Sequence, residues 1–249
     1  MKGVILAGGT GSRLMPMTEV TNKHLLPVYD KPMIFHPIMF LVNSGIKDIV
    51  IVTGGESAGH FLRLLKNGEE FGLNTLVYAY QKGSGGIADA LRLAKPFIGP
   101  GESMCVILGD NIFEYAMPGE VATFRRQEFG ARVMLKDVDD PHRFGVATID
   151  ASGVLTKITE KPANPDSNLA VTGVYFYDSR VFSYISQAKP SARGELEITD
   201  INNRYMEKGE LTCGAVEGWW SDAGTTDSLL RAANLAQNGG TSKVPRKSK

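Results

Sequence analysis

A glycine-rich turn directly follows the first apolar segment of the chain and constrains the fold more than any other feature. Residues 4–7, Val-Ile-Leu-Ala, predict a short buried strand. This strand runs into Gly8, Gly9, Thr10 and Gly11, followed by Ser12 and Arg13. Glycines lack a Cβ and therefore let backbone N–H groups approach a phosphate chain closely. The sequence thus predicts a phosphate-binding loop over residues 8–13.

Two cations strengthen this interpretation, and two better-known glycine loops do not fit. Arg13 brings a planar guanidinium that can grip phosphate oxygens in pairs, and Lys23 follows nearby. Leu14 stands where the dinucleotide pattern G-x-G-x-x-G needs its third glycine, and Gly11 lacks the Lys that follows a P-loop glycine. The remaining alternative is a tight turn that binds no ligand, which three glycines and an arginine in six residues disfavour.

Charge and composition exclude several function classes. The 27 basic residues balance the 27 acidic residues, so no overall field attracts nucleic acid or an anionic membrane. No apolar run reaches the length of about 18 residues that a membrane span requires. We see no signal peptide and expect a cytoplasmic protein. Cys105 and Cys213 are expected to be buried, reduced thiols, and the four histidines have no zinc-ligand spacing.

Strand-like and helix-like segments alternate through the first half of the chain. The expected strands are residues 4–7, 49–53, 75–80, 104–108 and 132–136. The expected helices between them are residues 33–44, 57–66, 86–96 and 117–127. Continuous apolar strands separated by helices predict an α/β fold with a single doubly wound, mostly parallel sheet. Ligands of such sheets bind beyond the carboxyl ends of the strands, which is where the glycine loop lies.

The second half is richer in strands but shows no linker before it. Strands are expected at residues 145–149, 154–159 and 170–177, with a hairpin turn at Asp150-Ala-Ser-Gly153. Helices are expected at residues 179–187, 197–207 and 225–236. We therefore predict one domain over residues 1–238, with halves at about 1–139 and 140–238. The polar, glycine-bearing residues 239–249 are expected to form a disordered tail.

Two aspartates are candidate metal ligands. Asp110 follows the apolar strand 104–108, at the sheet edge where the glycine loop is expected, and Asp222 stands before a predicted helix. Mg²⁺ binds through one or two carboxylates together with substrate phosphates. The alternative for Asp222 is that it caps the following helix, because aspartate is favoured at that position.

Polar residues at three other element ends could contact a substrate. Gln81 ends a strand, and its amide offers a donor and an acceptor that suit the edge of a pyrimidine, while Gly86 would let the base or ribose approach the backbone. A loop that merely caps the next helix explains this segment equally well. Lys161 and Arg193 could hold a phosphate and Glu160 a sugar hydroxyl, although isolated charges are usually solvated.

The combination of these segments resembles the glucose-1-phosphate thymidylyltransferase family of sugar-1-phosphate nucleotidyltransferases. The matching stretches occur in the family's order and span nearly the whole chain. They are LAGGTGSRL (6–14), TNKHLLPVYDKPMI (21–34), GGIADA (85–90), LGDNIF (108–113), RFGVA (143–147), EKP (160–162), VTGVYFYD (171–178), GELEITDIN (194–202) and WSDAGT (220–225).

The resemblance implies a role for each matching residue. Nucleotide binding is implied for Leu6, Gly8, Gly9, Thr10, Gly11, Ser12, Arg13, Gln81, Gly86 and Asp110. Sugar-phosphate binding is implied for Gly145, Glu160, Lys161, Val171 and Arg193. Arg13, Lys23 and Lys161 would be catalytic, while Asp110 and Asp222 would bind Mg²⁺. The implied substrates are dTTP and glucose 1-phosphate, with the nucleotide in the first half of the chain and the sugar phosphate in the second.

Some features depart from the family or leave alternatives open. Ser12 replaces a common threonine, and Asp89 replaces a frequent glutamine, which could alter contacts near the nucleotide. The sequence resembles the short form of the family, without the C-terminal helical segment of longer members. A homo-oligomer, dimer or tetramer, is expected by resemblance. Uridylyl, cytidylyl or adenylyl transfer is the alternative activity, and a non-catalytic nucleotide-sugar sensor is the alternative outside catalysis.

Overall fold

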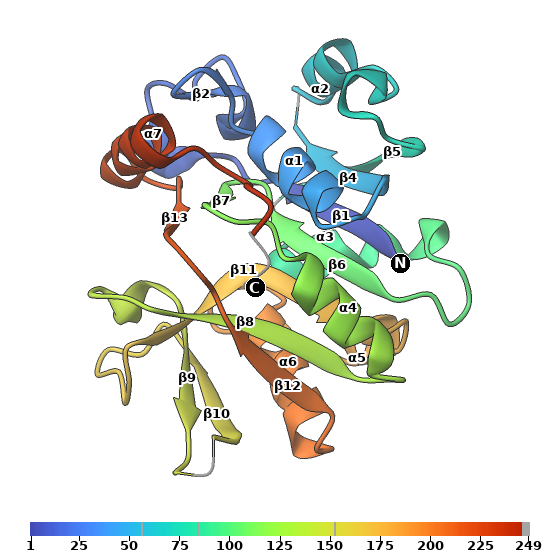
Figure 1. Ribbon diagram of the computed structural model, residues 1–249, viewed down its shortest axis with the longest axis vertical. Coiled ribbons are helices and arrows are strands. Elements are labelled where there is room, and N and C mark those ends of the chain that lie inside the picture. The colour runs from blue at the N-terminus through green and yellow to red at the C-terminus, as the bar shows by residue number, and fades with distance from the viewer. Residues whose placement is uncertain (56, 84, 152, 246–249) are drawn as a thin grey trace.

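Strand β1 (Lys2–Ala7) lies inside a nine-stranded sheet in the computed structural model, which describes residues 1–55, 57–83, 85–151 and 153–245. The other strands of this sheet are β4 (Asp48–Gly54), β5 (Thr75–Gln81), β6 (Met104–Leu108), β8 (Ala131–Asp137), β9 (Gly145–Ile149), β10 (Leu155–Glu160), β11 (Leu169–Tyr177) and β12 (Leu211–Ala215). The strand order is β10-β9-β11-β6-β1-β4-β5, and β8 pairs with both β11 and β12. Figure 1 shows the two halves of the chain joined through the middle of this sheet.

The two halves differ in strand direction. Strands β6, β1, β4 and β5 are parallel, which confirms the doubly wound arrangement predicted for the first half. The second half joins through β11, which runs antiparallel to β6, β8 and β9. Strands β9 and β10 form the predicted antiparallel hairpin, although Ser152 in its turn lies outside the described residues. The sheet is therefore continuous from one half to the other.

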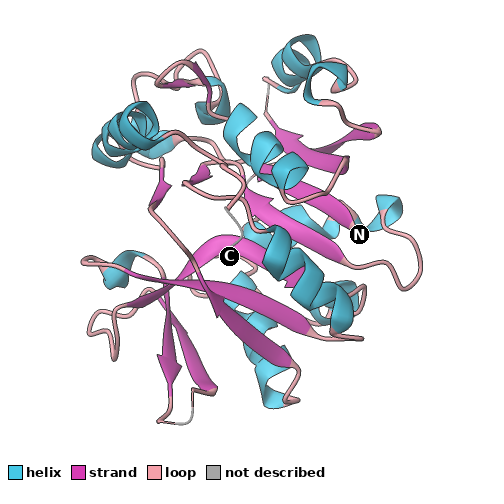
Figure 2. Cartoon of the chain, in the orientation of Figure 1, coloured by secondary structure: helices cyan, strands magenta, loops and turns pink. Residues whose placement is uncertain are grey.

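Helices cover both faces of this sheet (Figure 2). One face packs against α1 (Phe35–Asn43), α2 (Ala58–Leu65) and α4 (Pro118–Arg126). The other face packs against α3 (Ile87–Arg92), α5 (Val181–Ser186) and α6 (Ile198–Glu207). Alternate residues of β1 enter the two cores, Val4 on one side and Ile5 on the other. Burial on both faces explains why this strand is continuously apolar.

A small second sheet positions Asp222. Strand β7 (Asn111–Phe113) pairs antiparallel with β13 (Trp220–Asp222), and this register sets Asp222 opposite Asn111. The following helix α7 (Thr226–Gly239) is capped by Thr225, whose side chain accepts a hydrogen bond from the backbone of Ser228. Asp222 is therefore a strand residue and does not cap the helix. A third, two-stranded sheet joins β2 (Pro27–Val28) and β3 (Lys31–Pro32).

The expectation of a disordered tail from residue 239 is wrong for the residues that the structure describes there. The backbone of Ser242 donates to Phe113, and the backbone of Lys243 donates to Glu114, with both N···O distances at 2.8 Å. Thr241 lies 3.0 Å from the ring nitrogen Nδ1 of His36, and Ser242 is 1% exposed. We call residues 241–243 the C-terminal strap. Backbone pairing to β7 outweighs the polar composition that predicted disorder.

Two further expectations can be compared with the structure. Cys105 is buried, Cys213 is partly buried, and both are free thiols. Among the described residues, no helix is long and apolar enough to cross a membrane.

Candidate active site

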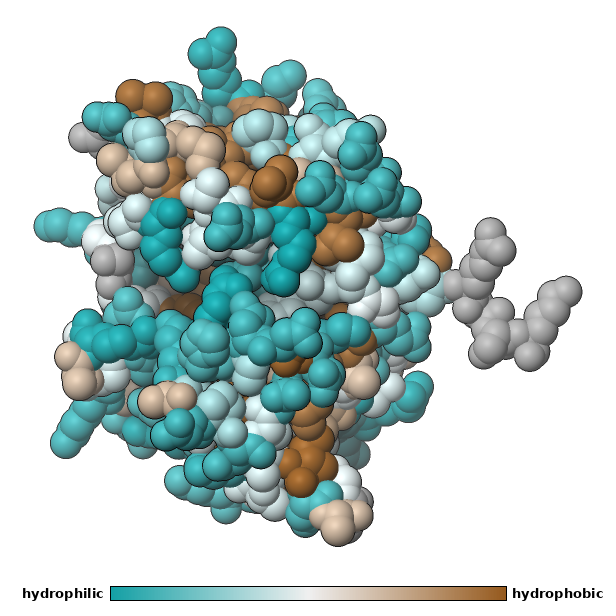
Figure 3. All heavy atoms as spheres, turned by 90° about the vertical axis from the view of Figure 1, so that its left-hand side faces the viewer, coloured by the Kyte–Doolittle hydropathy of each residue, from teal (hydrophilic) through white to brown (hydrophobic). Residues whose placement is uncertain are grey.

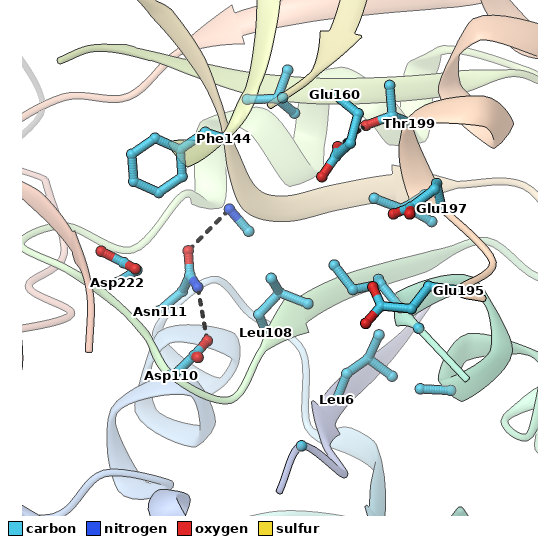
Figure 4. A pocket seen from close by; sticks show the side chains of 18 of the residues that line it. Leu6, Leu108, Asp110, Asn111, Phe144, Glu160, Glu195, Glu197, Thr199 and Asp222 are labelled. Atoms are coloured by element: carbon cyan, nitrogen blue, oxygen red, sulfur yellow. Dashed lines mark hydrogen bonds between the residues drawn. The ribbon is translucent and has the colours of Figure 1, made fainter. Parts of the chain in front are cut away.

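A cavity of about 560 Å³ lies between the two halves of the chain and contains most of the predicted site residues. Figure 4 shows Asp110 and Asp222 on one side of this cavity and Glu160, Glu195 and Glu197 on the other. In Figure 3, hydrophilic side chains form a band across the middle of the molecule. The predicted residues that line the cavity are Leu6, Gly8, Gly9, Arg13, Lys23, Gln81, Gly86, Asp110, Gly145, Glu160, Lys161, Val171, Arg193 and Asp222.

Three predicted residues of the glycine loop do not line the cavity. Thr10 and Ser12 are exposed, and Gly11 forms the bend between them. Gly11 has φ 69°, and a Cβ on it would lie 2.9 Å from the methyl group of Thr18, so the bend requires glycine. The loop therefore reaches the cavity through Gly8, Gly9 and Arg13.

The two candidate metal ligands and Arg13 converge on one point. A Cβ placed on Gly224 would lie 3.2 Å from an Arg13 guanidinium nitrogen, 3.4 Å from Asp222 Oδ2 and 3.6 Å from Asp110 Oδ2. These side chains come from the glycine loop, from β13 and from the end of β6, which are far apart in the sequence. The absence of a side chain at Gly224 leaves room between them.

Asp110 forms an ion pair with the side chain of Lys23. The ammonium group of Lys23 pairs with Asp110 Oδ2, and only 9% of Asp110 is exposed. Burial alone would raise the pKa of this carboxyl, but the charges of Lys23 and His24 and the hydrogen bonds from Lys23 and Asn111 together lower the pKa well below its ordinary value. Asp110 is thus a fixed negative charge in the cavity.

Asp222 forms an ion pair with Arg143, a residue that the sequence analysis did not single out. A guanidinium nitrogen of Arg143 donates to Asp222 Oδ2 at 2.7 Å, and another donates to Asp140 at 2.7 Å. Burial raises the pKa of Asp222, the nearby Asp110 charge adds to this, and Arg143 opposes it. Asp222 Oδ1 is buried and accepts no hydrogen bond from any residue that the structure describes.

The donor set fits a divalent cation bound jointly with phosphate. The described residues contain no cluster of three or more His, Cys, Asp or Glu side chains that could hold a metal alone. Two carboxylates that face the same space, one with an unpartnered buried oxygen, match the way Mg²⁺ uses few protein ligands and completes its shell with phosphate and water.

Asn111 supports this arrangement and was missed by the sequence analysis. Its amide nitrogen donates to Asp110 at 3.0 Å. Its oxygen accepts from the backbone of Gly173 at 3.0 Å and from the indole of Trp220 at 2.8 Å. A Cβ on Gly173 would lie 2.5 Å from this amide, so the contact requires glycine. Asn111 therefore ties the Asp110 loop to β11 and β13.

Gln81 and Gly86, the residues predicted to receive the base, also line the cavity. Gln81, the last residue of β5, is 4% exposed, and its Nε2 donates to Asp89 at 2.9 Å. Gly86 precedes α3 with φ 95°, and a Cβ there would lie 2.7 Å from the carbonyl oxygen of Leu196. Close packing on the segment before α6 therefore contributes to the requirement for glycine at position 86, whatever it binds.

The predicted sugar-phosphate residues gather on the second half. Thr199 donates to Glu160 at 2.5 Å, and Gly145 faces both side chains at the start of β9. Arg193 donates to Glu197 at 2.9 Å and to Glu160 at 3.3 Å. Lys161 has φ 43°, an uncommon backbone conformation for a lysine, and such strain is typical of functional sites. Thr199 and Glu197 were given no role by the sequence analysis, although both lie in the matching stretch GELEITDIN (194–202).

Comparison with known proteins identifies the class of protein that this fold and cavity define. The family model for nucleotidyl transferases matches residues 2–239, and the chain belongs to this family. Two relatives are named glucose-1-phosphate thymidylyltransferase. That of Neisseria meningitidis is 45% identical, with 95% of this chain and 83% of the relative covered. That of Xanthomonas campestris is 46% identical, with 95% and 80% covered.

Two solved structures have the same fold as this chain. A Bacillus anthracis protein assigned as a glucose-1-phosphate thymidylyltransferase, crystallised with sucrose, superposes with a TM-score of 0.91 at 53% identity, covering 100% of this chain and 98% of that chain. A UDP-glucose pyrophosphorylase with bound UDP-glucose superposes with a TM-score of 0.83 at 23% identity, covering 95% and 98%, which shows a shared fold.

Proposed function

We propose that the protein transfers a thymidylyl group from dTTP to α-D-glucose 1-phosphate, giving dTDP-glucose and pyrophosphate. The observation that carries this proposal is the convergence of Arg13, Asp110 and Asp222 around the space beside Gly224. The similarity to proteins named glucose-1-phosphate thymidylyltransferase supports the choice of substrates.

The chemistry requires positioning more than proton transfer. The attacking phosphate oxygen of the sugar phosphate is already an anion, so an in-line attack on the α-phosphorus needs no strong general base. Two polyanions must instead be brought together, and preorganised cations can offset their repulsion. Arg13, Lys23, Lys161 and Arg193 all line the cavity, where the first two would hold the triphosphate and the last two the sugar phosphate.

Asp110 and Asp222 would hold Mg²⁺ together with the triphosphate. When bound, the cation would withdraw electron density from the phosphoryl oxygens and neutralise charge in the transition state. Lys23 and Arg143 now pair with these two carboxylates, so both cations would exchange partners when the metal and triphosphate enter. Lys23 is thereby free to bind phosphate oxygens.

Residues from the two halves of the chain would set the orientation of the substrates in the cavity. Gln81 and Gly86 would receive the base, with Leu6, Gly8 and Gly9 beneath the nucleotide. Gly145, Glu160 and Val171 would contact the hexose. Holding both reactants in this geometry can lower the barrier by about 7–11 kcal/mol.

The test is a product assay with competing triphosphates. The protein is incubated with Mg²⁺, glucose 1-phosphate and dTTP, UTP, CTP or ATP, while pyrophosphate release is followed and the nucleotide sugar is identified by mass spectrometry. We expect dTDP-glucose as the main product. Preferential use of UTP, CTP or ATP would show that the site prefers another base than thymine. The absence of pyrophosphate release with all four triphosphates would favour a nucleotide-sugar sensor.

A further inference from the structure

Asp89 contacts Gln81, the residue that we propose receives the base. It lies in the first turn of α3, and its Oδ2 accepts a hydrogen bond from Gln81 Nε2 at 2.9 Å. Its other oxygen accepts from Arg92 at 2.7 Å. The two oxygens of Asp89 are therefore both occupied, one by the amide of Gln81 and one by a guanidinium.

The chemistry of Asp89 decides which way the Gln81 amide faces. An ionised carboxylate can only accept hydrogen bonds, so it must meet the NH₂ end of the amide and not its oxygen. Burial would raise the pKa of Asp89, but its hydrogen bonds to Arg92 and Gln81 lower it below the ordinary value. A neutral side-chain amide at position 89 would not impose this choice, because it can donate or accept a hydrogen bond.

The opposite end of the amide is directed toward the cavity. Gln81 Oε1 lies against Gly8, 2.3 Å from the position of a Cβ on that residue, and both residues line the cavity. No hydrogen bond from another described residue reaches Oε1, and Oε1 is not one of the buried polar atoms without a partner among the described residues, so it is open to the cavity. An acceptor that is open to the cavity is available to a hydrogen-bond donor on a ligand.

We propose that Asp89 is a positioning residue that holds the Gln81 amide with its oxygen toward the base, so that the site accepts a pyrimidine with a protonated N3 and rejects cytosine. This inference rests on the proposed function and deepens it. Thymine and uracil present an N3–H donor to the oxygen. Cytosine presents a lone pair at N3, and a site built for one hydrogen-bond pattern strongly rejects the other.

The test compares nucleotide preference in matched variants of the full chain. We would measure kcat/KM for dTTP, dUTP and dCTP with saturating glucose 1-phosphate and Mg²⁺, together with direct binding of each nucleotide by calorimetry. Asp89→Asn removes the acceptor-only group at nearly constant size. We expect the dTTP-to-dCTP preference to fall by about tenfold or more, on the scale of one hydrogen bond. The dTTP-to-dUTP preference should not change, because both bases carry N3–H.

A second pair of variants separates positioning from loss of structure. In the double variant Gln81→Glu, Asp89→Asn, the amide at position 89 would donate a hydrogen bond to the carboxylate at position 81. The second oxygen of that carboxylate would then face the base. We expect this double variant to regain the preference against dCTP that Asp89→Asn loses. Arg92→Gln removes the other partner of Asp89 but leaves its carboxylate, and should keep the wild-type preference.

The possible results have different meanings. An unchanged dTTP-to-dCTP preference in Asp89→Asn would overturn the inference. An equal fall in the dTTP-to-dUTP preference of this variant would also overturn it. So would a fall in the dTTP-to-dCTP preference of Arg92→Gln that matches the fall in Asp89→Asn. A wild-type protein that makes no nucleotide sugar would refute the proposed function alone. The binding measurements would still test the role of Asp89, and equal binding of dTTP and dCTP by the wild type would overturn it.

Discussion

Arg143 donates to Asp222 across 2.7 Å and so occupies a carboxylate that we assign to the metal site. Mg²⁺ that uses Asp222 Oδ2 must compete with this guanidinium. We predict that Arg143→Gln tightens Mg²⁺ binding to the free protein by about tenfold, because a hydrogen bond between charged groups contributes about 1.5–3 kcal/mol. Calorimetric titration without nucleotide measures this affinity.

A matched control removes a similar ion pair elsewhere. Arg132 donates to Glu120 at 2.6 Å, and neither residue lines the cavity. Arg132→Gln should leave the Mg²⁺ affinity unchanged. Unchanged or weaker Mg²⁺ binding in Arg143→Gln would show that Arg143 does not compete with the metal.

Gly8 and Gln81 are packed so closely that a methyl group between them would displace the amide. We predict that Gly8→Ala raises the KM for dTTP by about tenfold, because its Cβ would meet Gln81 Oε1 at 2.3 Å and cost the base one hydrogen bond. Gly119→Ala is the control, since a Cβ at this position in α4 meets nothing within 4 Å. A Gly8→Ala protein with the wild-type KM would place the base elsewhere.

The C-terminal strap contributes to stability. A chain that ends at Gly240 loses the backbone hydrogen bonds of Ser242 and Lys243 to β7 and the residue that follows it, and the contact of Thr241 with His36. At about 0.5–1.5 kcal/mol for each hydrogen bond, we predict a loss of about 2–4 kcal/mol in the free energy of unfolding. Urea denaturation measures the loss, and a chain ending at Pro245 should retain wild-type stability. Equal stability of the two chains would show that the strap contributes nothing.

The buried ring of His36 makes stability depend on pH. Burial lowers its pKa from 6.5 to about 4, with a further contribution from Lys31. Between these values the unfolded chain binds a proton that the folded chain does not, so stability falls as pH decreases from 6.5 toward 4. The loss attributable to His36 is at most about 3 kcal/mol.

The corresponding measurement compares unfolding free energies at about pH 7.5 and about pH 5 in the wild type and in His36→Asn, which cannot titrate there. The variant should lose less stability between the two values. An equal loss in both proteins would assign the pH dependence to other groups, among them the buried His24, whose pKa burial lowers to about 3.

The sequence predicted the elements of the fold well because their signals are local. Alternate burial of Val4 and Ile5 in two cores is what a continuous apolar run indicates. Asp110 was singled out because it follows a strand-like segment, and Asp222 because it stands before a predicted helix in a stretch that matches the family. Asn111 and Arg143 were missed because their partners are distant in the sequence. Asn111 accepts hydrogen bonds from residues 62 and 109 positions away. Arg143 pairs with Asp222, which is 79 positions away. The strap was missed for the same reason, since only its distant partner β7 orders it.

The most direct test of the site is whether Asp110 and Asp222 act as one unit. Turnover is measured for Asp110→Asn, Asp222→Asn and the double variant, with circular dichroism to verify folding. We predict that each single change lowers kcat by about a hundredfold or more, and that the double variant loses about as much as the more damaged single variant. Losses that multiply in the double variant, or turnover near the wild type in either single variant, would contradict a shared metal site.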